Sequence, residues 1–265
     1  MNIFKPGEID FWRRRCGSIR FLLALLVLQF CDGTLSWANL RRINEEYSHQ
    51  VWNFDIETAG TLPPNLVVGT LVDGRSAGNW QVIEMKQSLD LLQDLERREH
   101  HRIKKVLQAL VAPSPPHVIA QLNHRAFEQD YNVVLVQGLT VTDFDLHVSL
   151  LPVAGKADMG GGLIWRARDA QNYYLARANP LEQNIRFYRV VKGGRYKLAN
   201  FDHIISVDIW HTFRVAARGN YFQVIFDGQT VFEVQDETFQ SGQIGLWTKA
   251  DAVTFFDDLR LSVVK

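Results

Sequence analysis

Apolar and polar residues alternate along most of the second half of this sequence, with the period of two that is typical of β-strands. The run 242–261 shows this alternation clearly and predicts two strands joined by a short charged turn. In the first of them Ile244 and Leu246 share one face, whereas Trp247 lies on the other. The run therefore predicts a sheet with at least one buried face.

Further alternating segments fill the chain from residue 131 onward, and turn signals such as Asp227-Gly228 separate them. Strands are predicted over residues 66–70, 79–84, 117–121, 131–136, 143–152, 160–168, 172–178, 184–191, 195–199, 210–217, 221–226 and 230–235. Near the carboxy terminus, Phe255 and Leu259 are expected to seal the core. Roughly a dozen strands, with a turn signal about every 8–12 residues, predict an all-β sandwich of two antiparallel sheets.

Residues 88–111 break this pattern. They contain no glycine or proline, and their leucines recur at the three- and four-residue spacing of a helix. We therefore predict a helical insertion at about 88–111, either as one helix or as two that are broken near His100. The insertion is either a lid or partner-binding arm, or a surface addition that packs its leucines on the sandwich.

The amino terminus carries the pattern of a secretory signal. Basic residues precede an apolar run at 21–30, which is shorter than the roughly 20 residues of a membrane-spanning helix. Small residues at Ser36 and Ala38 favour cleavage after Ala38. We therefore expect a signal peptide over 1–38 and a single domain over 39–265.

Two alternatives to cleavage remain open at this terminus. The apolar run could stay as an uncleaved anchor, or Cys31 could carry a lipid, although Phe30 is bulky for the position before a lipidated cysteine. In every version the domain is expected to be secreted or periplasmic. Membrane contact is then expected only through an uncleaved signal anchor.

Charge and cysteine content narrow the classes of function. Lys plus Arg and Asp plus Glu are equal, at 29 each, so no overall positive field attracts nucleic acid and no nucleic-acid partner is expected. The two cysteines, Cys16 and Cys31, both lie in the predicted signal. Its removal would exclude cysteine nucleophiles, disulfides and cysteine metal sites together.

Four motifs in the predicted strands resemble a known family. They are Gly-Gly-Gly-Leu-Ile-Trp-Arg at 160–166, Asn-Tyr-Tyr-Leu-Ala-Arg-Ala-Asn-Pro-Leu-Glu at 172–182, Gly-Leu-Trp-Thr-Lys-Ala-Asp at 245–251 and Phe-Asp-Asp-Leu at 256–259. These resemble concanavalin A-like (laminin-G-like) jelly rolls. More narrowly, they resemble bacterial secreted domains related to the 3-keto-disaccharide hydrolases and family-sixteen glycosidase-like modules.

The resemblance covers about residues 52–264, apart from 88–110. It implies a jelly-roll fold and the binding or processing of carbohydrate outside the cytoplasm. The Glu-x-Asp-x-x-Glu strand of family-sixteen glycosidases is absent from the sequence. Because ordinary glycoside hydrolysis needs two carboxylates at a fixed separation, that catalysis is not carried over.

Candidate ligand residues follow from strand alternation together with the resemblance. Arginine, tyrosine and tryptophan on one face could stack on a sugar ring and hydrogen-bond its hydroxyls, and arginine could hold a carboxylated sugar. The candidates are Arg166, Tyr173, Arg177, Asn179, Trp247, Lys249 and Asp251. The alternative is that the arginines and tyrosines are solvated sheet residues and that Trp247 fills the core.

Asp258 is the candidate metal ligand, because Ca²⁺ prefers oxygen ligands and many folds of this type bind it near the last strand. The alternative is that Asp258 accepts backbone N–H bonds and caps a loop. Calcium is therefore the one cofactor that the sequence suggests. The histidines are scattered and do not have the spacing of a zinc site.

Three functions remain open from the sequence. The leading one is a carbohydrate-binding module without confirmed catalysis, with a glycan or polysaccharide as its partner. The second is a glycoside-processing enzyme similar to the 3-keto-disaccharide hydrolases, in which Glu182, Asp251 or His203 could transfer protons. The third is a structural adhesion module.

Overall fold

The fold was analysed in a computed structural model, which describes residues 47–70, 74–75, 77–84, 113–114, 116–122, 130–207 and 209–264. All of them belong to the compact unit Tyr47–Lys265. The predicted signal peptide at 1–38 and the predicted helical insertion at 88–111 lie outside the described residues. Within the described part of the chain, no helix is both long and apolar enough to span a bilayer.

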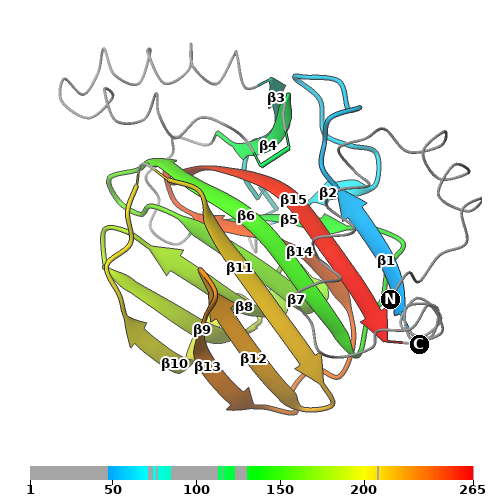
Figure 1. Cartoon of the computed structure of the whole chain (residues 1–265), viewed down its shortest axis with the longest axis vertical. Helices are drawn as coiled ribbons and strands as arrows, with labels where there is room; N and C mark the ends of the chain where they lie inside the picture. Colours follow the sequence, from blue (N-terminus) through cyan, green and yellow to red (C-terminus); the bar gives the residue numbers. More distant parts are fainter. Residues whose placement is uncertain are drawn as a thin grey trace, which may run out of the picture. The chain divides into compact units, whose positions relative to one another are not determined.

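The described residues form strands, and the all-β prediction is confirmed (Figure 1). The strands are β1 Tyr47–Trp52, β2 Leu66–Val68, β3 Trp80–Glu84, β4 His117–Gln121, β5 Tyr131–Val136, β6 Phe144–Ala154, β7 Gly161–Asp169, β8 Asn172–Asn179, β9 Asn184–Val191, β10 Gly194–Asp202, β11 His211–Arg218, β12 Tyr221–Phe226, β13 Gln229–Gln235, β14 Gln243–Lys249 and β15 Val253–Val264. The predicted hairpin turn at Asp227-Gly228 joins β12 to β13, and both residues have positive φ, as the tight turn of a two-residue hairpin requires.

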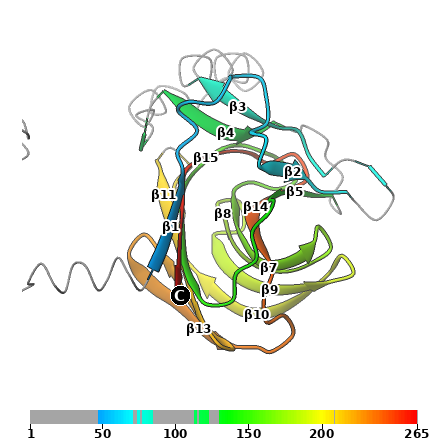
Figure 2. The same cartoon turned by 90° about the vertical axis from the view of Figure 1, so that its right-hand side faces the viewer.

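Two antiparallel sheets face each other, as the jelly-roll prediction requires (Figure 2). Sheet I has the strand order β13-β12-β11-β6-β15-β4-β3, and β1 also pairs with β15. Sheet II has the order β10-β9-β8-β7-β14-β5-β2. The last strand, β15, runs beside β6 on one side, and β4 and then β1 pair with successive parts of its other side.

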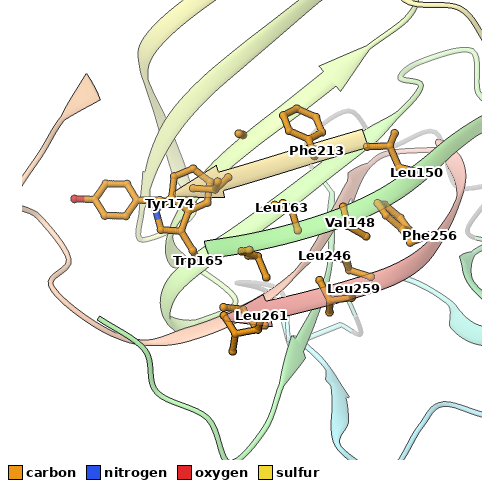
Figure 3. Packing of buried hydrophobic residues seen from close by; sticks show 14 of the residues in the cluster. Val148, Leu150, Leu163, Trp165, Tyr174, Phe213, Leu246, Phe256, Leu259 and Leu261 are labelled. Atoms are coloured by element: carbon orange, nitrogen blue, oxygen red, sulfur yellow. The ribbon is translucent and has the colours of Figure 1, made fainter. Parts of the chain in front are cut away.

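The space between the sheets is filled by the inward positions of each strand (Figure 3). Val148 and Leu150 of β6 meet Leu163 of β7 and Leu246 of β14 in this layer, and all four are buried. An aromatic cluster of Trp165, Tyr174, Phe187 and Phe222 fills the same layer, with ring centroids 4.8–6.0 Å apart. Alternating apolar positions in the sequence therefore do form one core.

The expectation for Phe255 is wrong, whereas that for Leu259 is confirmed. Phe256 and Leu259 face the core between the sheets, and Phe255 lies in a separate apolar cluster with Val118 and Leu151. The register of β15 against β6 shifts after Asp257, and φ is +51° at the following residue. This β-bulge adds one residue to β15, so that side chains three positions apart share a face.

The outer face of sheet II is also largely apolar. Its buried residues form a second cluster, and they come from strands β5, β7, β8, β9 and β14 as well as from the segment before β3. The cluster contains Ala77, Val133, Leu135, Ile164, Ala167, Tyr173, Leu175, Tyr188, Val190 and Trp247. Two predicted ligand residues, Tyr173 and Trp247, are thus packed in this layer.

Candidate functional site

Five of the seven predicted ligand residues lie on one surface, the outer face of sheet II. Tyr173, Arg177 and Asn179 occupy alternate positions of β8, and Trp247 and Lys249 occupy alternate positions of β14. Strand β7 lies between β8 and β14 and links them through one glycine, Gly162, which pairs with Arg177 on one side and with Trp247 on the other. The antiparallel register therefore brings together residues about 70 positions apart in sequence.

A polar network begins at Arg177, which is only 2% exposed. Its guanidinium donates to Glu182 Oε2 at 2.9 Å and to Asn184 Oδ1 at 2.7 Å. Arg186 Nη1 lies 2.6 Å from the same Glu182 oxygen. One carboxylate therefore neutralises two arginines on neighbouring strands.

Asn179 joins this carboxylate to a second one. Its Nδ2 donates to Asp158 Oδ1 at 2.9 Å and to Glu182 Oε1 at 3.5 Å. Lys249 Nζ completes the chain at 3.1 Å from Asp158 Oδ2. We call these residues the Asp158–Glu182 network: Asp158, Arg177, Asn179, Glu182, Arg186 and Lys249.

Main-chain contacts fix the geometry of both carboxylates. Asn179 Oδ1 accepts the N–H groups of Leu181 and Glu182, which shapes the turn after β8. Asp251 accepts the N–H groups of residues 156, 157 and 158 at 2.8–3.0 Å. Asp251, a predicted ligand residue, therefore holds the loop that carries Asp158.

The two carboxylates have opposite shifts of pKa. Burial raises the pKa of Asp158, and the charge of Lys249 opposes that rise. Burial also acts to raise the pKa of Glu182, but Arg177, Asn184 and Arg186 outweigh it and hold that pKa below its usual value. The pair therefore combines a carboxyl that keeps its proton to higher pH with one that remains ionised.

The network borders an aromatic platform, which we define as Tyr131, Tyr188 and Trp247. The hydroxyl of Tyr188 accepts a bond from Arg186 Nη1 at 3.4 Å, which links the platform to the network. Trp247 is 1% exposed and packs 5.6 Å from the ring of Tyr131. It supports the surface from beneath and does not offer a free ring face for stacking on a sugar.

The guanidinium of Arg195 covers the platform. Its central carbon lies 5.1 Å from the ring centroid of Tyr131, 5.0 Å from that of Tyr188 and 6.0 Å from that of Trp247. Contacts at these distances are cation–π interactions. A single arginine thus contacts rings from three strands.

Arg166, another predicted ligand residue, lies at the rim of the sandwich and not in the network. Its guanidinium donates to the backbone carbonyls of Thr142, Gly219 and Phe239 at 2.6–3.2 Å. Its φ of +49° marks a bulge in β7 that turns the side chain away from the outer face. A cavity of about 400 Å³ adjoins it, and Asp236 and Glu237 are among the residues of its lining.

The predicted calcium ligand has protein partners. Asp258 accepts a bond from Arg260 at 2.9 Å, and the adjacent Asp257 accepts from the N–H and hydroxyl of Ser114. Over the residues that the structure describes, no group of three or more His, Cys, Asp or Glu is arranged to hold a metal ion. Calcium binding stays a prediction.

The three residues suggested for proton transfer have separate environments. Glu182 belongs to the network, and Asp251 binds the backbone of a loop. The ring of His203 stacks on Phe201 at 5.8 Å and contacts Phe226 edge-on at 6.0 Å. Of the three, Glu182 alone shares hydrogen-bond partners with a second carboxylate.

Sequence reasoning missed five members of this surface: Tyr131, Asp158, Arg186, Tyr188 and Arg195. A signal for two of them was present, because Arg186 and Tyr188 alternate with the core residues Ile185 and Phe187. Asp158 lies in a loop, where no periodicity reports the direction of a side chain.

One family of known domains matches most of this chain. The family model of the 3-keto-alpha-glucoside-1,2-lyase-like domain matches residues 68–262. A levanase of Bacillus subtilis (strain 168) is 25% identical over 133 residues, which are 49% of this chain and 19% of that protein. The chain thus spans about a fifth of the length of this curated relative.

Two solved structures that resemble this chain are the following. The carbohydrate-binding module CBM66 from Bacillus subtilis has 22% identity and a TM-score of 0.49, covering 54% of this chain and 85% of that one. A mutant of the GH43 protein BlXynB from Bacillus licheniformis has 11% identity and a TM-score of 0.46, covering 84% and 40%.

The family match extends over nearly three quarters of the sequence and spans the strands that build the outer face of sheet II. The resemblance of the sequence motifs to the 3-keto-disaccharide hydrolase-related modules is therefore confirmed. This chain belongs to the family of 3-keto-alpha-glucoside-1,2-lyase-like domains.

Proposed function

We propose that this protein binds a glycan on the outer face of sheet II, in an extracytoplasmic compartment. The observation that carries the proposal is the Asp158–Glu182 network. Its two carboxylates and three cations are partnered by side chains, and the side chain of Glu182 is 38% exposed. Sugar hydroxyls both donate and accept hydrogen bonds, so they can join such a network without leaving a buried charge unpaired.

The family description supports a sugar as the class of ligand, because it names an activity on glucosides. The burial of Trp247 limits how the sugar is held. We expect hydroxyl groups to bind Glu182, Arg186 and Lys249, which are the more exposed members of the network. Affinity then comes mainly from directional hydrogen bonds and less from stacking.

A glycan array with the full chain tests this proposal, run once with Ca²⁺ and once with a chelator. Glu182→Gln should lose at least about tenfold in affinity, because charge-assisted bonds are replaced by neutral ones. Glu237→Gln is the matched control, since Glu237 is at the rim and bonds Asn220. The absence of bound glycan in both conditions would contradict the proposal, and loss with the chelator would support a calcium site.

The Asp158–Glu182 pair favours a second candidate function, an elimination on 3-keto-glucosides. In such a reaction an ionised carboxylate removes the proton from C2, the C1–O bond breaks, and an acid protonates the departing oxygen while a C1=C2 bond forms. Glu182 stays ionised, as a base must be, and shares Asn179 with the buried Asp158, whose raised pKa favours the protonated form that an acid needs. The word lyase in the family description supports this chemistry.

An assay of 3-keto-glucoside turnover, measured by the release of the leaving alcohol, separates glycan binding from elimination. Asp158→Asn and Glu182→Gln should each lower kcat by about a hundredfold or more, whereas Glu237→Gln should not. The parent glucoside without the keto group serves as a negative control, because its C2 proton is not acidic. If the keto sugar binds but is not consumed, the glycan-binding function stands and the enzymatic one does not.

A further inference from the structure

Strand β10 adds two cations to the outer face of sheet II, beside the aromatic platform. Arg195 pairs with Val190 and Lys197 pairs with Tyr188, both of which are outward-facing residues of β9. In an antiparallel pair, residues opposite each other point to the same face. Arg195 and Lys197 therefore occupy consecutive outward positions of β10.

These two cations differ from the other cations of the same face. Arg177 and Arg186 share Glu182, and Lys249 pairs with Asp158. Within the described ranges, neither Arg195 nor Lys197 forms an ion pair or a side-chain hydrogen bond. The outer face thus carries positive charge that its own carboxylates do not neutralise.

The rings beneath Arg195 hold its guanidinium in place while leaving its N–H groups unused. Contact with the three rings of the platform limits the movement of the guanidinium, and the side chain is half-buried. A planar guanidinium with unused donors matches the two oxygens of a carboxylate. The preorganised arginine loses little rotational freedom when such an anion binds.

Tyr188 connects this pair of cations to the network. Its ring lies 5.0 Å from the guanidinium carbon of Arg195 and 6.0 Å from that of Arg177. One saccharide could therefore place its hydroxyl groups on Glu182 and Arg186 and an acidic group on Arg195.

We propose that the ligand is an acidic saccharide, whose carboxylate is held by Arg195 with Lys197 beside it. This inference rests on the proposed glycan-binding function and names the chemical class of the glycan. The acidic sugar is a uronic acid residue within an oligosaccharide. The alternative is that Arg195 only covers the aromatic platform and takes no part in binding.

Binding of the full chain to oligosaccharides of glucuronic, galacturonic and mannuronic acid tests the inference, with the methyl ester of each as its uncharged partner. Arg195→Met keeps the apolar stem over the rings but removes the charge and the donors. It should weaken binding of the acid by about ten- to a hundredfold and leave binding of the ester unchanged. Lys197→Met should have a smaller effect that disappears at high salt.

Arg214→Met is the matched control, because it removes the same charge from sheet I, where Arg214 pairs with Asp145. A urea titration of each variant separates loss of binding from loss of folding. Where Arg195→Met is not folded, Arg195→Lys replaces it, since lysine keeps the charge but not the two-pronged donor. This variant should still bind the acid, but more weakly than the wild type.

The outcomes distinguish the inference from the proposed function. Preference for the acid over its ester, lost in Arg195→Met and kept in Arg214→Met, supports the inference. Equal binding of acid and ester, or an Arg195→Met variant that binds the acid normally, overturns the inference and leaves glycan binding intact. If no neutral or acidic sugar binds at all, glycan binding itself fails and the inference fails with it.

Discussion

Two buried arginines on neighbouring strands, Arg166 of β7 and Arg177 of β8, differ in their main hydrogen-bond partners. Both are at most 2% exposed, and both were predicted as ligand residues. Arg166 donates to three backbone carbonyls and lies 3.7 Å from the carboxylate of Asp143, whereas Arg177 donates mainly to the side chains of Glu182 and Asn184.

The partners of a buried arginine decide whether its charge can take part in binding. Backbone carbonyls cannot move without moving the chain. Arg166 therefore holds together the three chain segments that carry Thr142, Gly219 and Phe239. The carboxylate that binds Arg177 is partly open to solvent, so a ligand can share it. Burial alone therefore does not separate a structural arginine from a functional one, but the nature of its partners does.

Replacing Arg166 should have the largest effect on stability. Arg166→Met would leave the carbonyls of Thr142, Gly219 and Phe239 without this donor, and we expect a loss of about 4 kcal/mol in the free energy of unfolding. Urea denaturation measures it. Glycan affinity per folded molecule should be unchanged, and a drop in that affinity would contradict a purely structural role for Arg166.

Asp257 is a buried carboxylate that, like Arg166, is held mainly by the backbone. Its partners are two backbone N–H groups and the hydroxyl of Ser114. Burial raises its pKa to about 6, although these donors oppose the rise. The native state then holds a proton that the unfolded state has lost, so this group makes stability fall as pH rises from about 4 to about 6. The loss should reach up to about 3 kcal/mol.

Urea midpoints of the wild type and Asp257→Asn at several pH values measure this contribution. The stability of the variant relative to the wild type should increase across that range, because asparagine does not titrate. The loss of one hydrogen-bond acceptor in the variant lowers the free energy of unfolding by the same amount at every pH, so it does not change how that free energy depends on pH. A pH-independent difference between the two proteins would contradict the assignment.

Arg177→Met should be less costly than Arg166→Met, at about 2 kcal/mol, because water can reach the released carboxylate of Glu182. Its effect on binding should be larger, with a loss of more than about tenfold in glycan affinity. Calorimetry with the best ligand from the array measures it. An Arg177→Met variant with normal affinity would place the ligand elsewhere.

Glu182→Gln should have the smallest effect on stability, at about 1 kcal/mol, because the glutamine carbonyl can still accept a hydrogen bond from the buried Arg177 and the side chain of residue 182 is 38% exposed. Together with its loss of glycan affinity, this would separate binding from folding at one residue. Thermal unfolding without ligand provides the measurement. Destabilisation as large as that of Arg166→Met would mean that Glu182 is structural too.

The strands, the two-sheet fold and the family were predictable from sequence, because alternation and local motifs report them directly. The structure also places five of the seven predicted ligand residues on one face, since β8 and β14 have regular alternation there. Prediction failed where the backbone departs from that regularity. Bulges at Arg166 and Asp258 have positive φ and change which side chains face outward.

The position of Asp158 could not be derived in this way. It depends on Asp251, a residue 93 positions later, which binds the backbone of the loop. Arg195 likewise meets Trp247 only because four strand pairings bring β10 and β14 into one sheet. Such contacts are set by the register of the whole sheet, and no local pattern encodes them.

The place of β15 in sheet I bears on the order in which the two sheets fold. This strand follows all the other described strands in sequence, yet it joins β6 to β4 and β1, and Tyr47 pairs with Val264 (Figure 1). Strands β7 to β10 can form as successive local hairpins, whereas the middle of sheet I cannot form until β15 has been synthesised. Pairing across such a sequence distance slows folding, so we expect sheet I to close after these hairpins of sheet II have formed.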